Sequence, residues 1–253
     1  MLLDVKNLSV SFGGLKAVNQ FEIQIGAQEL VGLIGPNGAG KTTIFNLLTG
    51  VYTPNEGSIL LDGKSLAGKG SNKIVNMGVA RTFQNIRLFK NLTVIDNVKI
   101  AFQFQMKYSP LAAVLRLPSY WREEKIFEEK AMDLLKIFKL EGFAHQKACN
   151  LPYGEQRKLE IARALATEPK LLLLDEPAAG MNPSETKELM ETIQLVKEKY
   201  AIAILLIEHD MALVMGICEK VVVLEYGSII ASGSPEQIQN DPRVIASYLG
   251  EDD

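Results

Sequence analysis

A glycine-rich loop between an apolar run and a helical pattern constrains this chain more than any other segment. Residues 30–34 form a continuous apolar run, and residues 35–42, GPNGAGKT, follow it and match the pattern GxxxxGK[ST] in full. Apolar residues between 42 and 48 then recur at helical spacing until Gly50. A strand, a loop and a helix in this order predict a phosphate-binding loop at the end of a buried strand.

The chemistry of phosphate binding explains the residue types of this loop. Glycines let successive backbone N–H groups turn toward a phosphate, and the following helix adds the positive end of its dipole. Lys41 places a flexible positive charge near the terminal phosphates, and the hydroxyl of Thr42 is a ligand for Mg²⁺. The full motif in its required context favours this interpretation over an incidental glycine-rich turn. The predicted nucleotide-binding residues of the loop are Gly35, Pro36, Asn37, Gly38, Ala39, Gly40, Lys41, Thr42 and Thr43.

Two carboxylates follow a second buried run. Four leucines at 171–174 precede Asp175 and Glu176, and a buried strand delivers its last residues to the carboxyl edge of the sheet. We therefore expect Asp175 to hold Mg²⁺, directly or through water, and Glu176, on the opposite side of the pleat, to orient or deprotonate an attacking water. A strand that simply ends in polar residues is the alternative. Two acidic residues in a chain that also has a phosphate loop favour a metal and water site over this alternative.

Apolar runs that alternate with helical patterns indicate the fold class. The runs at 30–34, 170–174 and 201–207 have the length of buried strands, and the segments 155–166 and 184–199 have helical spacing. Such an alternation is typical of an α/β protein with a mostly parallel sheet. Further strand-like stretches lie near the two ends of the chain, at 3–12, 21–25, 58–61, 221–224 and 228–231.

The stretch from about 92 to 149 has a different texture. Strand-like runs give way to apolar residues at helical spacing, such as Leu134, Leu135 and Phe138. We expect a helical insert between two parts of the sheet, with the proline-flanked residues 110–118 forming a loop or a short helix.

Composition and charge exclude several classes of protein. The 253 residues are 47% apolar and 23% charged, which is ordinary for a globular protein with a substantial core. A formal net charge of −3 gives no strongly basic footprint for nucleic acid. Cys149 and Cys218 stand far apart, which excludes a zinc ribbon and favours a reducing compartment.

No apolar run approaches the roughly 20 residues that cross a bilayer, and the N-terminus lacks the layout of a signal peptide. Any membrane role is therefore expected to act through a partner.

Five further segments resemble those of ABC ATPases and occur in the order typical of that family. They are Phe12, RTFQ at 81–84, LPYGEQRKLEIARAL at 151–165, AGMN at 179–182 and IEHD at 207–210. The resemblance implies one ABC ATPase domain, 1–253, with a RecA-like parallel-sheet core at 1–90 and 155–253. It also implies an N-terminal antiparallel β subdomain and an α-helical subdomain inserted at about 91–154.

The resemblance also assigns roles to single residues. It implies that Gln84 contacts Mg²⁺ and the attacking water, that His209 lies near the γ-phosphate, and that Phe12 stacks on adenine. An isolated histidine is more often a surface residue, so the role of His209 is inferred from its position among the other segments of the family. For Phe12, ordinary core packing is the alternative. The predicted catalytic residues are Glu176, His209, Gln84 and Lys41, and the predicted ligands of Mg²⁺ are Thr42, Gln84 and Asp175.

The segment at 151–165 resembles the signature of the family. Gly154 would open a helix without a side chain in the way, so that a phosphate could approach the free N–H groups and the positive end of the helix. A helical insert separates it from the phosphate loop, and the resemblance implies that the signature of one subunit closes the ATP site of another. Tyr153 and Glu155 depart from the signature of the family, and Asn182 stands where an aspartate is common. The predicted nucleotide contacts here are Tyr153, Gly154, Glu155 and Gln156.

The closer resemblance is to the ATPases of branched-chain amino acid importers. It rests on the segments at 12–18, 81–89 and 175–183, on the long insert near 110–118, and on the ending from 234–238 to 248–250. It implies an ATP-hydrolysing subunit at the cytoplasmic face of the cell membrane, with ATP and Mg²⁺ as cofactors. The implied partners are integral membrane permease subunits, a second ATPase subunit that is either a copy or a paralogue, and, indirectly, a solute-binding protein. No nucleic acid is expected.

Several alternatives share part of this pattern. Urea or amide importers and lipopolysaccharide exporters use similar ATPases and remain open. An ABC-type DNA-repair or translation factor would carry coiled coils, a zinc module or a second ATPase domain, none of which the sequence shows. A GTPase would need a guanine-reading aspartate, and the pair Asn72-Lys73 is followed by isoleucine and valine.

Overall fold

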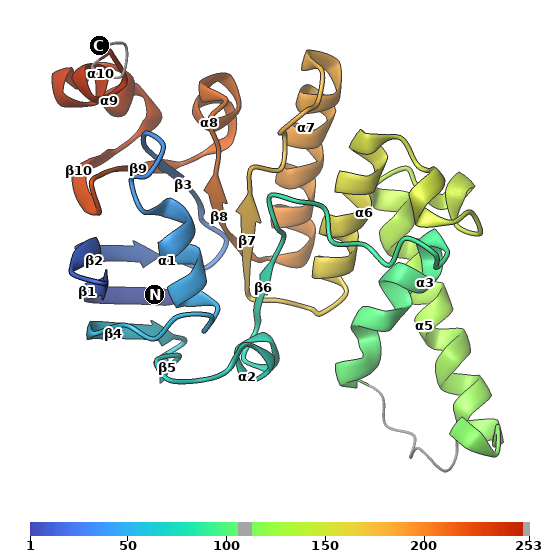
Figure 1. The fold of residues 1–253 in the computed structure, drawn as a ribbon. Helices are drawn as coiled ribbons and strands as arrows, with labels where there is room; N and C mark the ends of the chain where they lie inside the picture. The colour runs from blue at the N-terminus through green and yellow to red at the C-terminus, as the bar shows by residue number, and fades with distance from the viewer. Residues whose placement is uncertain (106–112, 250–253) are drawn as a thin grey trace.

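Two β-sheets and a block of helices make up the protein (Figure 1). The structure is a computed structural model and describes residues 1–105 and 113–249. The strands are β1 (Leu3–Phe12), β2 (Leu15–Ile25), β3 (Leu30–Ile34), β4 (Glu56–Leu61), β5 (Lys64–Ser65), β6 (Val79–Arg81), β7 (Leu171–Asp175), β8 (Ala203–Ile207), β9 (Lys220–Glu225) and β10 (Ser228–Gly233). The helices are α1 (Lys41–Leu48), α2 (Ser71–Asn76), α3 (Val94–Lys99), α5 (Pro118–Ile137), α6 (Tyr153–Leu165), α7 (Pro183–Tyr200), α8 (Met211–Ile217), α9 (Pro235–Gln239) and α10 (Pro242–Leu249), with short 3₁₀ segments at Ile100–Gln105, Glu141–Phe143 and Ala148–Asn150.

The larger sheet confirms the expected parallel core. Its strand order is β10-β9-β3-β8-β7-β6, and each neighbouring pair except the β9–β10 hairpin is parallel. Because β3 lies inside the sheet, the glycine-rich loop that follows it emerges at the carboxyl edge with strands on both sides. β8 and then β7 follow on one side, and they end at Ile207 and Asp175.

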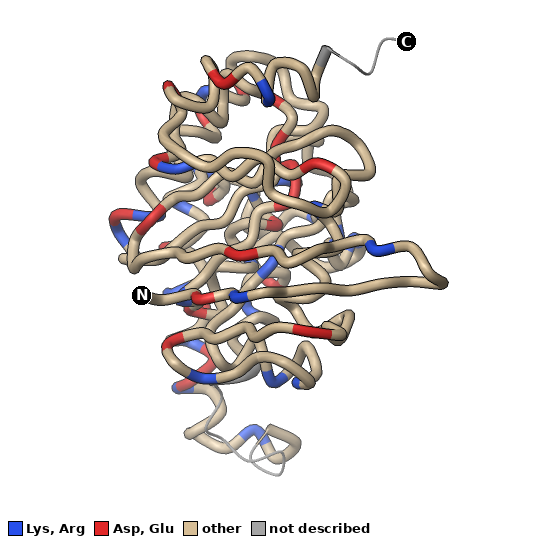
Figure 2. The backbone as a smooth tube through the Cα atoms, turned by 90° about the vertical axis from the view of Figure 1, so that its left-hand side faces the viewer, with Lys and Arg blue, Asp and Glu red and all other residues tan. Residues whose placement is uncertain are grey.

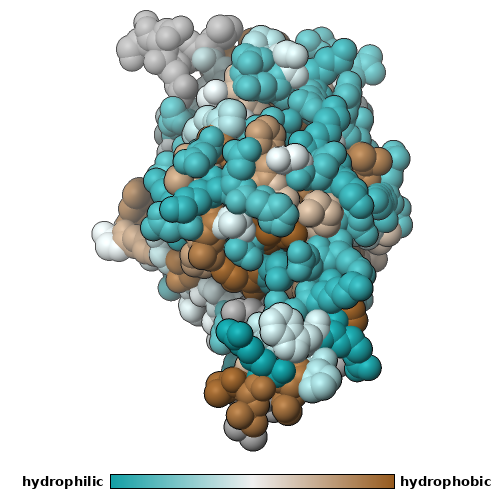
Figure 3. All heavy atoms as spheres, turned by 90° about the vertical axis from the view of Figure 1, so that its right-hand side faces the viewer, coloured by the Kyte–Doolittle hydropathy of each residue, from teal (hydrophilic) through white to brown (hydrophobic). Residues whose placement is uncertain are grey.

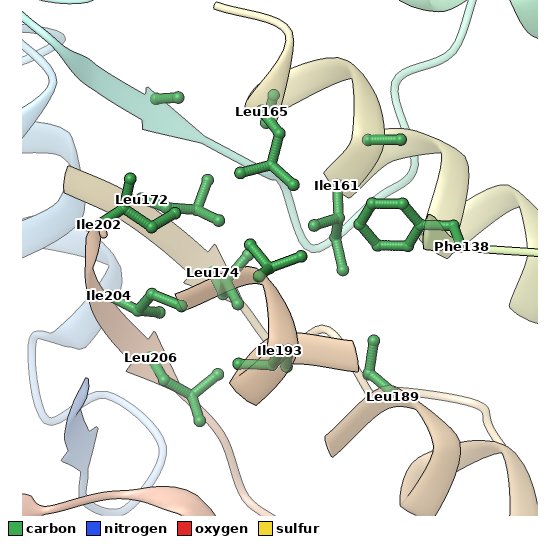
Figure 4. Packing of buried hydrophobic residues seen from close by; sticks show 14 of the residues in the cluster. Phe138, Ile161, Leu165, Leu172, Leu174, Leu189, Ile193, Ile202, Ile204 and Leu206 are labelled. Carbon is green, nitrogen blue, oxygen red and sulfur yellow. The ribbon is translucent and has the colours of Figure 1, made fainter. Parts of the chain in front are cut away.

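Alternating side chains on the buried strands divide the core into two clusters. Leu171 and Leu173 of β7 pack with α1 and the smaller sheet, whereas Leu172 and Leu174 pack with α6 and α7 on the other face. Figure 4 shows the second face, with the leucines among side chains of α6, α7 and β8. Since both faces of the strand are covered, a continuous apolar run is the pattern that it requires.

The smaller sheet is the N-terminal antiparallel part, with the order β2-β1-β4-β5. Phe12 pairs with Leu15 across a two-residue turn in which Gly13 and Gly14 have φ angles of 52° and 89°. Such a turn needs positive φ at both residues. β2 therefore begins directly after it, well before the predicted start at residue 21.

Helices α3 and α5 lie in the stretch for which the change of texture predicted helices, and α6, which was predicted as part of the core, joins them in the block between β6 and β7. The side chain of Thr93 accepts the backbone N–H of Asp96 and so caps α3. α5 begins at Pro118, and residues 110–112 of the predicted loop lie outside the described residues. α6 packs on α3, α5 and β6, and the predicted boundary between 154 and 155 falls inside this continuous helix.

Charges of both signs and one apolar area mark the surface. Basic and acidic residues are interspersed along the backbone drawn in Figure 2. On the opposite face, apolar side chains gather at the lower end, around the start of α5, where Val114, Leu115 and Leu117 are exposed (Figure 3). Within residues 1–105 and 113–249, no helix is both long and apolar enough to span a bilayer.

The buried face of α7 gives a test of the packing. Ile193 is 2% exposed and Leu195, two residues later on the same helix, is 48% exposed. Ile193→Ala should lower the free energy of unfolding by about 2–5 kcal/mol, because it leaves a cavity between α7 and the sheet. Leu195→Ala is the matched control and should change it by about 0.5 kcal/mol or less. Equal losses in urea denaturation of the two variants would contradict this packing.

Candidate active site

The glycine-rich loop turns between β3 and α1 in conformations that favour glycine. Gly35, Gly38 and Gly40 have φ angles of 147°, 78° and 103°. A Cβ on Gly35 would lie 2.0 Å from the carbonyl oxygen of Leu224, and one on Gly40 would lie 2.7 Å from that of Ala17. The loop therefore needs these glycines both for its own backbone and for its contacts with β9 and β2.

Helix α1 presents its N-terminus to the loop. Its N-cap residue is Gly40, which has no side chain to cap the first N–H groups, so the positive end of the helix dipole faces the loop. Lys41 is buried, and its Nζ donates hydrogen bonds to the carbonyl oxygens of Gly35 at 2.5 Å and of Pro36 at 2.9 Å. The next residue, Thr42, is exposed. The loop thus curves around the lysine, whose role at the terminal phosphates stays a prediction.

A cavity of about 510 Å³ lies over the loop. Residues 37–43 line it together with Gln84, Glu176 and His209, so the structure brings the predicted catalytic residues of four segments into one place. The remaining predicted site residues do not line this cavity: Phe12, Gly35, Pro36, Tyr153, Gly154, Glu155, Gln156 and Asp175.

Glu176 lies at the centre of the predicted catalytic residues. Nε2 of Gln84 donates a hydrogen bond to its Oε2 at 2.9 Å, and Nε2 of His209 lies 2.9 Å from its Oε1. Glu176 follows the last residue of β7 with a φ of 49°, and its N–H donates to the carbonyl oxygen of Ile207 at 2.9 Å. A left-handed turn, and not the pleat of the strand, directs this side chain, which corrects the prediction.

Arg81, the partner of Asp175, was not among the predicted site residues. Their Nη2 and Oδ2 atoms are 2.7 Å apart, and the two side chains are 7% and 5% exposed. The guanidinium also donates to Oδ1 of Asn46 at 2.7 Å and lies over the rings of Phe45 and Phe83. The buried carboxylate thus has a fixed counter-charge, without which its burial would be costly. Arg81 belongs to the RTFQ segment, but nothing in the sequence indicated that it pairs with Asp175 of another strand.

Glu208 is a second buried residue beside the site that the sequence analysis did not assign. It is 4% exposed, and its carboxylate accepts the N–H groups of Ala178 at 2.7 Å and of His209 at 3.0 Å. Burial raises the pKa of Glu208, while these backbone donors oppose that rise. One carboxylate therefore fixes both the loop after Glu176 and the backbone of His209.

The signature segment does not face this cavity. α6 begins at Tyr153, earlier than the predicted start at Glu155, and no side chain caps its N-terminus. Gly154 is buried, and a Cβ there would lie 3.3 Å from Oε1 of Glu185, which belongs to the capping box of α7. The carboxylate of α7 thus takes the space beside this glycine, where the sequence predicted an open approach.

Phe12 does not have the core environment that the sequence analysis considered as the alternative to a contact with adenine. It is 44% exposed, so it is not a core residue, and its ring centroid lies 4.9 Å from that of Tyr52 in an edge-to-face contact. Lys16 and Tyr226 line the cavity, and Tyr226 is 88% exposed. Tyr226 lies in the β9–β10 turn, far from any motif, so its sequence context gave no signal.

The site fits a nucleoside triphosphate and Mg²⁺. Nothing lies within 4 Å of the place of a Cβ on Gly38, which leaves the loop backbone open to a phosphate. The uncapped start of α1 and the charge of Lys41 favour an anion there. The hydroxyl of Thr42, the amide oxygen of Gln84 and the carboxylate of Asp175 are hard oxygen donors, the kind that Mg²⁺ prefers.

A phosphate loop at the carboxyl edge of a parallel sheet, with a carboxylate held beside it, defines a P-loop nucleotide hydrolase. Residues 18–179 match the family described as ABC transporter, and residues 228–253 match the family described as branched-chain amino acid ATP-binding cassette transporter. The chain belongs to the ABC transporter family and is one of its ATP-binding ATPase subunits.

Known proteins resemble the chain over its whole length. The branched-chain amino acid transport ATP-binding protein LivG of Escherichia coli K12 is 50% identical over 250 residues, which cover 99% of this chain and 98% of LivG. BraF of Pseudomonas aeruginosa, described in the same words, is 46% identical over the same shares. A crystal structure of the ADP conformation of an ATP-binding cassette of an ABC transporter, MJ1267, superposes with a TM-score of 0.85 at 31% identity and covers 98% of both chains.

The buried pair at the end of β7 gives a prediction about stability. Arg81→Met should lower the free energy of unfolding by about 3–5 kcal/mol in the absence of nucleotide, because Asp175 is left buried without its counter-charge. The double variant Arg81→Met/Asp175→Asn should lose less, since the uncompensated charge is removed as well. Urea denaturation of both proteins measures this. An equal or larger loss in the double variant would show that the pair does not hold Asp175.

Proposed function

We propose that this chain is the ATP-hydrolysing subunit that energises an importer of branched-chain amino acids. The observation that carries hydrolysis is the carboxylate of Glu176, held by Gln84 and His209 at the cavity that the phosphate loop lines. The family matched by residues 228–253 and the names of the two relatives support branched-chain amino acids over urea, amides or lipopolysaccharide as the transported solute.

Each group at the cavity has a task in this hydrolysis. The backbone N–H groups of 37–43 and Nζ of Lys41 bind the β- and γ-phosphates of ATP. Glu176 orients the attacking water and takes its proton on a carboxylate oxygen. A carboxylate offers about four lone pairs, and its contacts with Gln84 and His209 occupy two of them, so lone pairs remain for the proton. Those two contacts keep the carboxylate from turning away from the terminal phosphate.

Thr42, Gln84 and Asp175 are the residues that would hold Mg²⁺. When bound, the ion supplies positive charge that stabilises the phosphate oxygens. Arg81 binds Oδ2 of Asp175, and the other lone pairs of this carboxylate remain for the ion or for a water on it. Arg81 thereby fixes the orientation of Asp175 before the metal binds.

The signature helix supports an ATP site that two subunits share. Residues 153–156 do not line the cavity of their own phosphate loop, and the start of α6 has no capping side chain. Its first N–H groups carry no cap of their own and would face a phosphate that another subunit brings, with the carboxylate of Glu185 beside Gly154. Each of two sites would combine the phosphate loop, the metal ligands and Glu176 of one subunit with the start of α6 of the other. The second subunit is a copy of this chain or a paralogue.

A second cavity, of about 260 Å³, supports docking of a permease subunit. Ala80 of β6, Ile100 after α3 and Ala164 of α6 line it, so it lies between the sheet and the helical block. Phe89 and Arg163 line it too, with the guanidinium 5.7 Å from the centroid of the ring. A groove that combines apolar side chains and an exposed ring with the charged Arg81, Glu160 and Arg163 suits a short amphipathic helix of a membrane subunit. Such docking places the chain at the cytoplasmic face of the cell membrane, where a solute-binding protein would act only indirectly.

Glu176→Gln tests the shared site and the hydrolytic role together. The variant should bind ATP, hydrolyse it about 10²–10⁴ times more slowly, and form a stable dimer at saturating MgATP because the sandwiched nucleotide is not consumed. Phosphate release and light scattering after size-exclusion chromatography measure the two effects. Glu168→Gln, at a carboxylate whose side chain is 62% exposed, is the control. Normal turnover would remove Glu176 from the mechanism, and a nucleotide-bound monomer would contradict the shared site.

Phe89→Ala tests the docking groove. Removal of a ring that is 50% exposed and lines the groove should weaken binding to the permease about tenfold or more. Titration of the purified subunit onto permease in detergent or nanodiscs measures the affinity. Leu195→Ala, on the exposed face of α7, should bind like the parent protein. An unchanged affinity of Phe89→Ala would place the docking surface elsewhere.

A further inference from the structure

Arg157 is a buried cation of α6 that no step of the hydrolysis uses. Its side chain is 2% exposed, and its Nη1 donates a hydrogen bond to the carbonyl oxygen of Phe83 at 2.7 Å. Its Nη2 donates to the carbonyl oxygen of Gln84 and, at 3.2 Å, to the hydroxyl oxygen of Tyr153. Oε2 of Glu160 lies 3.4 Å from Nη1 and supplies the counter-charge. One guanidinium therefore binds two consecutive carbonyl groups of the segment that carries Gln84.

Tyr153 links this guanidinium to a third segment. Cε1 of its ring lies 3.1 Å from the place of a Cβ on Gly180, and Gly180 has a φ of 78° in the loop that follows Glu176. The centre of the Arg157 guanidinium lies 5.6 Å from the centroid of the same ring. A small residue at 153 could make neither contact. The residue that departs from the family's signature thus joins the start of α6 to this loop.

These contacts form a closed chain that includes Glu176. Nε2 of Gln84 donates to Oε2 of Glu176 at 2.9 Å, and the N–H of Ala179 donates to the carbonyl oxygen of Glu176 at 3.2 Å. Gly180 comes next and lies against the ring of Tyr153. A displacement of the Gln84 backbone therefore changes the partners of Arg157, and with them the contacts at the start of α6.

We propose that Arg157 and Tyr153 are positioning residues that couple the place of Gln84 in one ATP site to the start of α6, which serves the ATP site of the other subunit. The inference rests on the shared site proposed above. A nucleotide that draws Gln84 toward it in one subunit thereby orients the signature helix and the Gly180 loop of that subunit for the partner.

Two substitutions separate this coupling from general stability. Arg157→Lys keeps the charge but loses the planar fork that binds two carbonyl groups at once. Tyr153→Phe keeps the ring and removes only the hydroxyl, and since Tyr153 is 47% exposed, it keeps the proposal testable if Arg157→Lys does not fold. The matched controls are Arg243→Lys, in an exposed ion pair of α10, and Tyr200→Phe, at the end of α7.

Each substitution is measured alone and combined with Glu176→Gln. Three quantities are compared: the affinity of the single chain for a fluorescent ATP analogue without Mg²⁺, kcat for ATP, and the MgATP concentration at the midpoint of dimerisation. For Arg157→Lys, the affinity for the analogue should stay within about twofold, while the midpoint rises about 5- to 150-fold, the usual range of coupling between sites, and kcat falls. Tyr153→Phe should show the same pattern to a smaller extent.

The outcomes separate this inference from the proposed function. A midpoint and a kcat equal to those of the controls in both variants would overturn the coupling. A weaker affinity for the analogue that accounts for the whole shift of the midpoint would overturn it too, because the effect would then be local to one nucleotide site. A Glu176→Gln protein that stays monomeric without any further substitution would instead overturn the shared site itself.

Discussion

The phosphate loop follows an inner strand of the parallel sheet, and the rest of the site depends on this position. Parallel strands end at a common edge, so β7 and β8 bring Glu176 and His209 to the edge where the loop leaves β3. Strands of both sheets press on the loop, because the carbonyl oxygens of Leu224 and Ala17 leave no room for a side chain at two of its glycines. The cavity and its catalytic cluster follow from this arrangement.

Features that depend on consecutive residues of the chain could be predicted from the sequence. The four leucines of β7 are continuous because helices cover one face of the strand and the smaller sheet the other. The face of α7 that carries Leu189, Ile193 and Val196 is buried as its spacing indicated. The phosphate loop was identified because its glycines and Lys41 are adjacent in the chain and each has a separate physical task.

Features that depend on strand order could not be predicted in the same way. Arg81 and Asp175 are 94 residues apart and meet because β6 pairs with β7. Glu208 reaches the loop after Glu176 because β8 pairs with β7. No local pattern shows either neighbour. The direction of Glu176 was mispredicted for a related reason: the strand ends one residue earlier than a continued pleat assumes, and a left-handed residue follows.

The start of α6 makes contacts within its own chain in addition to the contact with a partner that we propose. Gly154 leaves space for the Glu185 carboxylate in the capping box of α7, and Tyr153 lies against Gly180 in the loop before α7. Arg157, one turn further along the helix, binds the carbonyl oxygens of Phe83 and Gln84. These contacts join the helix start, the cap of α7 and the Gly180 loop into one packed unit. In the shared site that we propose, a displacement at the nucleotide of one subunit would reach its partner through this unit, since tightly packed contacts transmit strain.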